Sequence, residues 1–180
     1  HLTTRRQRQM CIRDSPGSGR ISMQLLSFTI GGQQYGIDTR NIIEVLPFIP
    51  AQELPQQPEE IRGLIRYRGK LLPVLDLCQL ILDRPCESRL GTRTVVVKLI
   101  HGSNAYSSHL FAITAEEVIG ISTTKLDNVT NVPSESFFGP IVDIDSNTTG
   151  MISIQIIIIE SLAKNKKLQT LMDYTRSELR

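Results

Sequence analysis

Residues 61–77 read IRGLIRYRGKLLPVLDL, and this stretch decides the fold. Side chains alternate between the two faces of a strand, so Arg66 and Arg68 are expected on one face and the apolar residues beside them on the other. Gly69-Lys70 is expected to form a turn, after which the chain returns as a strongly apolar strand. The stretch therefore predicts a β-hairpin with one packed face and one cationic face toward solvent.

Strand signals on either side of this hairpin predict a mainly β protein. A first hairpin is expected around Gly31-Gly32, a short helix or turn after Asp38, and a rigid proline-rich loop over residues 47–58. Further strands are expected at residues 94–100, 110–113, 141–144 and 151–159, the last buried because it is apolar on both faces. Leucines from residue 160 onward are spaced for a closing helix. Short strands separated by turns indicate a barrel or a sandwich.

Size and charge narrow the class of protein. The 180 residues suffice for one ordinary domain or two small ones that share a core. The net charge is +2, but residues 1–22 hold five arginines and one aspartate, which leaves the remainder at −2. A nucleic-acid binder concentrates cations on one face, and one candidate cluster exists, consisting of Arg62, Arg66, Arg68 and Lys70. Four cations on one hairpin suit a protein partner equally well.

The cysteines and the beginning of the chain predict a reduced, cytoplasmic environment. Cys11, Cys78 and Cys86 are odd in number and lack CxxC spacing, so neither a disulfide framework nor a zinc site is expected. The sequence contains no apolar stretch of about twenty residues, so no membrane span is predicted. Residues 1–22 lack the apolar region of a secretory signal and are interpreted as a disordered or foreign leader.

The hairpin sequence closely resembles the signature of the CheW-like domain, the adaptor module of bacterial chemotaxis arrays. The matching positions are Gly63, Arg68, Gly69, Pro73, Asp76 and Leu77, and upstream the segment 35–38 with Ile42, Glu44 and Val45. The resemblance implies two small SH3-like five-stranded β-barrel subdomains around a shared core, with a C-terminal helix. It places the domain at residues 23–165 and a helical tail at residues 166–180.

The resemblance also implies a non-catalytic adaptor that couples chemoreceptors to a CheA-type histidine kinase. The expected partners are the regulatory domain of that kinase and the cytoplasmic tip of methyl-accepting chemoreceptors, with recruitment to membrane-associated arrays and no direct membrane insertion. No cofactor, metal or catalytic residue is implied. The residues expected to bind partners are Ile42, Glu44, Gly63, Arg66 and Arg68. Arg66 stands where the family commonly has asparagine, so the choice of partner stays open.

Other functions were weighed against this one. An adaptor of a surface-sensing, pilus or second-messenger pathway keeps the fold, whereas a small β-barrel nucleic-acid binder would depend on the cationic hairpin alone. Enzyme motifs such as GxSxG, the Walker loop and HExxH do not occur. The carboxylates Glu44, Asp76 and Glu160 have no acidic partner evident in the sequence, and His101 and His109 flank a loop. These observations exclude a recognisable catalytic site.

Overall fold

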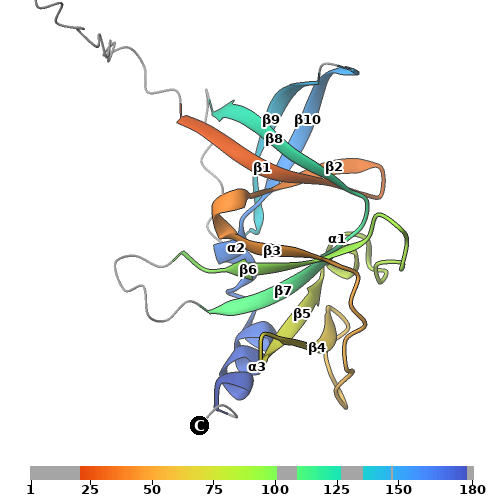
Figure 1. Ribbon diagram of the computed structural model, residues 1–180, viewed down its shortest axis with the longest axis vertical. Coiled ribbons are helices and arrows are strands. Elements are labelled where there is room, and N and C mark those ends of the chain that lie inside the picture. The colour runs from red at the N-terminus through yellow and green to blue at the C-terminus, as the bar shows by residue number, and fades with distance from the viewer. Residues whose placement is uncertain (1–20, 101–108, 127–135, 147, 178–180) are drawn as a thin grey trace, which may run out of the picture.

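The computed structural model describes residues 21–100, 109–126, 136–146 and 148–177, and arranges their strands in two five-stranded sheets (Figure 1). The first sheet has the order β8-β1-β2-β10-β9, with β1 at Ile21–Ile30, β2 at Gln33–Asp38, β8 at Val118–Leu126, β9 at Phe138–Ser146 and β10 at Gly150–Ile157. The second sheet has the order β3-β6-β7-β5-β4, with β3 at Ile42–Pro47, β4 at Ile61–Tyr67, β5 at Lys70–Asp76, β6 at Arg93–Lys98 and β7 at Leu110–Ala115. The predicted mainly β fold of two five-stranded subdomains is confirmed.

Three short helices lie at the ends of strands, and a helix of 12 residues follows the last of them. They are the 3-10 helix η1 at Thr39–Asn41, α1 at Leu77–Leu82, α2 at Ile159–Leu162 and α3 at Lys166–Ser177. Asp38 caps η1 by accepting a hydrogen bond from the amide of Arg40 at 2.9 Å, as its position before a turn predicts. In the described part of the chain, no helix has the length and apolar character needed to cross a membrane.

The two sheets are interleaved along the chain. The first sheet begins with β1 and β2, the chain then builds the whole second sheet, and β8 to β10 return to complete the first. The return is locked by parallel pairing of β10 with β2, while β5 pairs in parallel with β7 inside the second sheet. The first sheet therefore combines strands from both ends of the sequence, whereas the second sheet forms from one continuous stretch.

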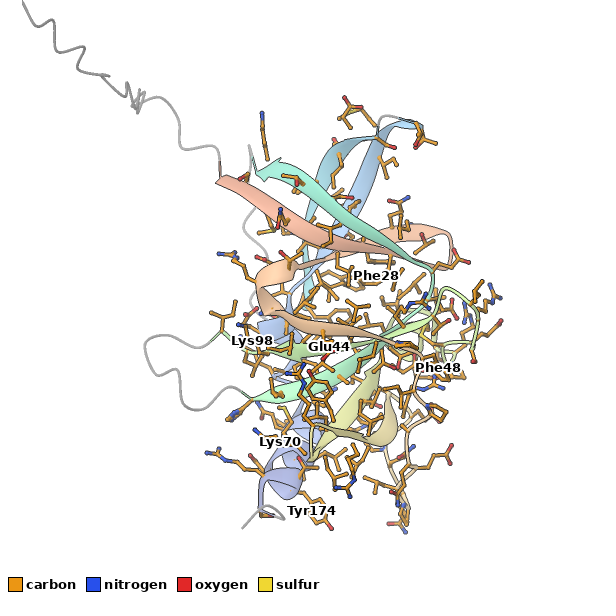
Figure 2. All side chains as sticks on the ribbon, in the orientation of Figure 1. Phe28, Glu44, Phe48, Lys70, Lys98 and Tyr174 are labelled. Atoms are coloured by element: carbon orange, nitrogen blue, oxygen red, sulfur yellow. A yellow bond between two sulfur atoms is a disulfide. The ribbon has the colours of Figure 1, made fainter. Side chains whose placement is uncertain are left out.

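One apolar core joins the two sheets. It combines Phe28 and Ile37 from the first sheet with Leu75 and Phe111 from the second, all fully buried. Figure 2 shows Phe28 on the side of the first sheet that faces the second. Leu168 of α3 is also fully buried in this cluster, so the predicted helical tail packs on the domain. Burial of this continuous apolar surface holds the subdomains together.

The signature hairpin forms as predicted but turns one residue earlier. Ile65 and Tyr67 are buried while Arg66 between them is exposed, which confirms the alternation. Tyr67 pairs with Lys70, so the turn residues are Arg68 and Gly69, with φ values of +46° and +79°. Two consecutive residues with positive φ match the twist of a two-residue hairpin turn. Arg68 therefore lies in the turn and not within the strand.

Four other features differ from the sequence predictions. Residues 118–126, which gave no strand prediction, form β8, and the closing helix is split into α2 and α3. The run 151–159 is buried mainly in its C-terminal half, since Ile157 is 1% exposed and Met151 is 69% exposed. Cys78 and Cys86 form a disulfide, because α1 and the following loop bring their Cα atoms to 5.0 Å despite spacing unlike CxxC.

Some sequence predictions fall outside the described residues. They include residues 1–20 of the expected leader, His101 and residues 178–180 of the expected tail. Ile21 and Ser22, the last two residues of the expected leader, belong to β1 and pair with β8.

Candidate partner-binding surface

Glu44 joins the two edge strands of the second sheet. Its Oε2 atom accepts a hydrogen bond from the Tyr67 hydroxyl at 2.6 Å and another from Arg68 Nη2 at 2.9 Å. Glu44 lies in β3, while Tyr67 ends β4 and Arg68 opens the hairpin turn. Because β3 and β4 are at opposite ends of the strand order, these bonds draw the sheet toward a closed barrel.

The charges of this cluster remain close to water. The side chains of Arg68 and Glu44 are 71% and 38% exposed. The hydrogen bond to Glu44 raises the pKa of Tyr67, and burial adds to the effect, so the hydroxyl stays protonated as the donor. The Arg68 guanidinium lies 5.1 Å from the centre of the Tyr67 ring. The cluster thus fixes the position of a cation that remains available to a partner.

Exposed groups of both signs and apolar side chains lie beside this cluster. Arg66 is exposed in β4, two residues before Arg68. Ile43 and Val45, the neighbours of Glu44 in β3, are each 40% exposed. We call Ile43, Glu44, Val45, Arg66 and Arg68 the hairpin surface. Partly exposed apolar residues bordered by charged ones are the usual composition of a protein-docking surface.

The other predicted residues lie beneath this surface. Ile42 is half-buried and packs against the shared core. Gly63 is buried with a φ of +128°, and a Cβ atom there would lie 2.1 Å from the carbonyl oxygen of Gln52. Gln52 and Leu64 exchange two backbone hydrogen bonds of 2.8 and 2.9 Å at this point. Gly63 therefore allows the proline-rich loop to cross β4 closely and presents no side chain to a partner.

A second arginine of the hairpin has a role that the sequence did not indicate. Arg62 Nη1 donates to Asp76 Oδ2 at 2.6 Å and to the carbonyl oxygen of Cys86 at 3.1 Å, and its guanidinium lies 5.1 Å from the Phe48 ring centre. Asp76 is 1% exposed and caps α1. Arg62 is thus bound internally and does not belong to the exposed cationic cluster. The position of Asp76 before a short apolar helix is a signal for the cap, but no pattern in the sequence pairs it with Arg62.

Glu160, the third carboxylate singled out from the sequence, also ties segments together. It accepts a hydrogen bond from Asn41 Nδ2 at 2.8 Å, and the same amide group donates to the carbonyl oxygen of Lys98 at 3.1 Å. Asn41 is buried, so this bond satisfies a polar group that would otherwise be costly. All three carboxylates thus have structural partners.

Comparison with known proteins identifies the same family along most of the domain. A family model described as the CheW-like domain matches residues 24–164. The chain is 30% identical to Protein FrzA of Myxococcus xanthus over 102 residues, which covers 57% of this chain and 59% of FrzA. It is 26% identical to the chemotaxis protein CheW of Helicobacter pylori over 114 residues, covering 63% of this chain and 67% of that protein.

Solved structures show the same fold. The scaffolding protein TtCheW of Thermoanaerobacter tengcongensis superposes with a TM-score of 0.62 at 19% identity, covering 82% of this chain and 91% of that one. The chain is also 25% identical to the chemotaxis protein CheW of Klebsiella aerogenes and covers 61% of that protein. In sequence, therefore, the chain spans less than two thirds of the length of both FrzA and this CheW.

Proposed function

The chain belongs to the CheW-like domain family, and from that premise we propose that it couples chemoreceptors to a CheA-type histidine kinase. Proteins of this family are non-catalytic scaffolds, in agreement with the non-enzymatic function expected from the sequence. The observation that carries the proposal is the contact of Glu44 with Tyr67 and Arg68, which holds the signature arginine in a fixed and exposed position.

Binding is proposed to occur through two surfaces. The hairpin surface, with exposed Ile43 and Val45 on the edge strand β3, would pair with the regulatory domain of the kinase. The junction between the two sheets would receive the helical tip of a chemoreceptor. Each contact would be modest in area and gain strength by repetition in a membrane-associated array. Signalling then becomes a shift between kinase states that share these contacts.

The test is titration of Arg68→Glu against a purified kinase regulatory domain and a receptor helical hairpin. Loss of a partly desolvated charge contact is expected to weaken binding by about 2–5 kcal/mol, while circular dichroism stays unchanged. Lys125→Glu in β8 is the matched control, because it makes the same charge change at an exposed position in the other sheet. Equal affinities of wild type and Arg68→Glu for both partners would refute the proposed surface.

A second candidate keeps the adaptor chemistry and changes the pathway. The exposed Arg66 at the usual asparagine position favours a kinase of a non-flagellar system. Arg66→Asn should then shift binding between regulatory domains from the different kinases of the host. If the preference between these domains is the same for both proteins, Arg66 does not select the pathway.

A further inference from the structure

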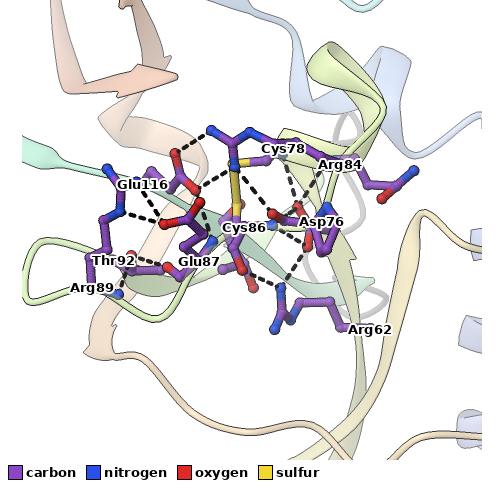
Figure 3. The surroundings of a disulfide bond; sticks show 12 residues. Arg62, Asp76, Cys78, Arg84, Cys86, Glu87, Arg89, Thr92 and Glu116 are labelled. Carbon is purple, nitrogen blue, oxygen red and sulfur yellow. Dashed lines mark hydrogen bonds and ion pairs between the residues drawn. A yellow bond between two sulfur atoms is a disulfide. The ribbon is translucent and has the colours of Figure 1, made fainter. Parts of the chain in front are cut away.

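Cys78 lies in α1, and Cys86 lies in the segment 83–92 that connects α1 to β6. They form a disulfide with a sequence separation of 8, and their side chains are 0% and 4% exposed. Figure 3 shows the cross-link between two groups of polar residues, one around Asp76 and one around Glu116. The bond lies apart from the hairpin surface, and the proposed adaptor function does not require it.

Two buried carboxylates hold the segment around Cys86 without using its sulfur. The Cys86 amide donates to Asp76 Oδ2 at 3.0 Å. The next amide, of Glu87, donates to Glu116 Oε1 at 2.8 Å, and Arg84 binds both oxygens of Glu116 at 2.9 and 3.1 Å. These bonds keep the two cysteines close whether or not they are joined. Such preorganisation makes an intramolecular disulfide easy to form again after reduction.

The reduced state also has a place in this structure. Cys86 Sγ lies 3.5 Å from the carbonyl oxygen of Thr114, which can accept a hydrogen bond from a thiol. A cross-link that closes so short a loop removes less entropy from the unfolded chain than one that closes a long loop, and a large core already joins the sheets. The fold therefore has sources of stability other than this bond.

We propose that Cys78 and Cys86 form a reversible thiol–disulfide exchange site whose oxidation locks the segment 86–92. The oxidant is a low-molecular-weight disulfide, RSSR. Cys86 is the less deeply buried of the two residues; its thiol loses a proton to water, and the thiolate attacks RSSR and releases one RS⁻. Deprotonated Cys78 then attacks Cys86 Sγ in the mixed disulfide and releases the second RS⁻. The two protons are taken up by the two RS⁻, so two cysteine thiols are oxidised and one RSSR becomes two RSH.

A metal site is the competing use of these residues. Ligand atoms of Asp76, Cys78 and Cys86 all lie within 4.8 Å of one another. The Asp76 carboxylate, however, accepts hydrogen bonds from the amides of Cys78, Gln79 and Cys86 and from the Arg62 guanidinium. A cation would have to displace that guanidinium from its contact at 2.6 Å. The geometry favours exchange over metal binding.

The locked segment presents an exposed apolar side chain. Leu90 is 94% exposed near its end, and the Arg89 side chain beside it is 51% exposed. Reduction removes the covalent tie at Cys86 and leaves the hydrogen bonds to Asp76 and Glu116. Amides of residues 86–92 should then open more often, while β5 and β7 keep their protection.

The experiment uses the full chain with Cys11→Ser, equilibrated in defined ratios of reduced and oxidised glutathione, with thiols then alkylated and counted by mass. The expected result is a single two-electron transition of Cys78 and Cys86 under native conditions. Hydrogen exchange of residues 86–92 should be about tenfold faster in the reduced protein. Glu116→Gln should speed reduction by about tenfold, because it weakens the docking that shields the disulfide.

Three results would overturn the proposal. The first is a pair that remains reduced in oxidised glutathione alone. The second is a disulfide that opens in reducing buffer only together with global unfolding, as for a permanent structural bond. The third is stoichiometric retention of Zn²⁺ by the reduced protein in native mass spectra. Cys86→Ser cannot form the disulfide and serves as the permanently reduced reference. Its hydrogen-exchange rates should match those of the reduced protein. Rates like those of the oxidised protein would show that the disulfide does not restrict the segment.

Discussion

The β4–β5 hairpin carries an arginine–carboxylate pair at each end, and the two pairs differ in burial. At the base, Arg62 contacts Asp76 at 2.6 Å with side chains 22% and 1% exposed. At the tip, Arg68 contacts Glu44 at 2.9 Å with side chains 71% and 38% exposed. The same chemistry therefore occurs once inside the fold and once on its surface.

Burial decides what each pair contributes. Asp76 has lost its water and depends on its protein donors, so removing it leaves the Arg62 guanidinium and several amides without an acceptor. Glu44 and Arg68 can each return to water, so their attraction adds little to stability. The base pair is part of the scaffold, and the tip pair is free to serve binding.

The largest expected effect comes from Asp76→Ala. The variant loses the cap of α1, the partner of Arg62 and the acceptor of the Cys86 amide, which should cost about 3–5 kcal/mol of unfolding free energy. Urea denaturation followed by circular dichroism measures this cost. Asp145→Ala, at an exposed position in β9, is the control and should change stability by less than about 0.5 kcal/mol. Similar urea midpoints for both variants would show that the buried pair at the base contributes no more to stability than an exposed residue does.

The second effect separates two glycines of the same hairpin. Gly63→Ala should cost about 3 kcal/mol, because its Cβ would collide with the Gln52 carbonyl oxygen, which belongs to a backbone segment. Gly69→Ala meets open space and should cost about 1 kcal/mol, from its positive φ alone. Thermal melts of both variants test the difference. Equal losses would mean that the crossing of the proline-rich loop is loose.

The third effect concerns pH and the buried Glu116. The hydrogen bonds from Arg84 lower the pKa of Glu116 below its ordinary value of 4.5, although burial opposes them. A carboxyl with a lowered pKa in the folded state stabilises the fold above its unfolded pKa, and this contribution disappears as pH falls through the folded pKa. Wild type should therefore lose stability on acidification below about pH 5, whereas Glu116→Gln should show a shallower loss.

The neutral variant itself should be about 1–3 kcal/mol less stable at pH 7, because a charged acceptor of buried donors is removed. Denaturant midpoints measured from pH 3 to pH 7 give both quantities. Parallel curves for the two proteins would show that Glu116 does not link folding to pH.

The hairpin could be predicted from the sequence because its signals are local. Alternation fixed the buried and exposed faces around Arg66, and the apolar return strand was evident. The turn lies one residue before its predicted position because Arg68 adopts a positive φ. Non-glycine residues seldom do so, and the sequence therefore did not indicate it. β8 was missed because its outward residues include Ile119 and Ile121, 63% and 66% exposed, so hydrophobic pattern and burial disagree there.

The candidate site could be predicted only in part, since its contacts join distant segments. Glu44 and Arg68 were both identified, but their shared hydrogen-bond cluster with Tyr67 spans 24 positions in sequence and depends on sheet closure. The pairing of Cys78 with Cys86 depends on a loop that is held by hydrogen bonds to Asp76 and Glu116. The spacing of the cysteines does not indicate this loop conformation. Long-range polar contacts are set by the fold, so they cannot be predicted from the sequence before the fold is known.

The smallest expected effect on folding is that of Arg68→Ala. Its ion pair with Glu44 is exposed and screened by salt, so the unfolding free energy should change by less than about 1 kcal/mol. Glu44→Ala should cost more, because Tyr67 is buried and loses the acceptor of its hydroxyl. A double-mutant cycle between Glu44→Ala and Arg68→Ala in urea, at low and high salt, isolates the pair. A coupling above about 2 kcal/mol that resists salt would show a desolvated internal tie, and the contrast between the two ends of the hairpin would fail.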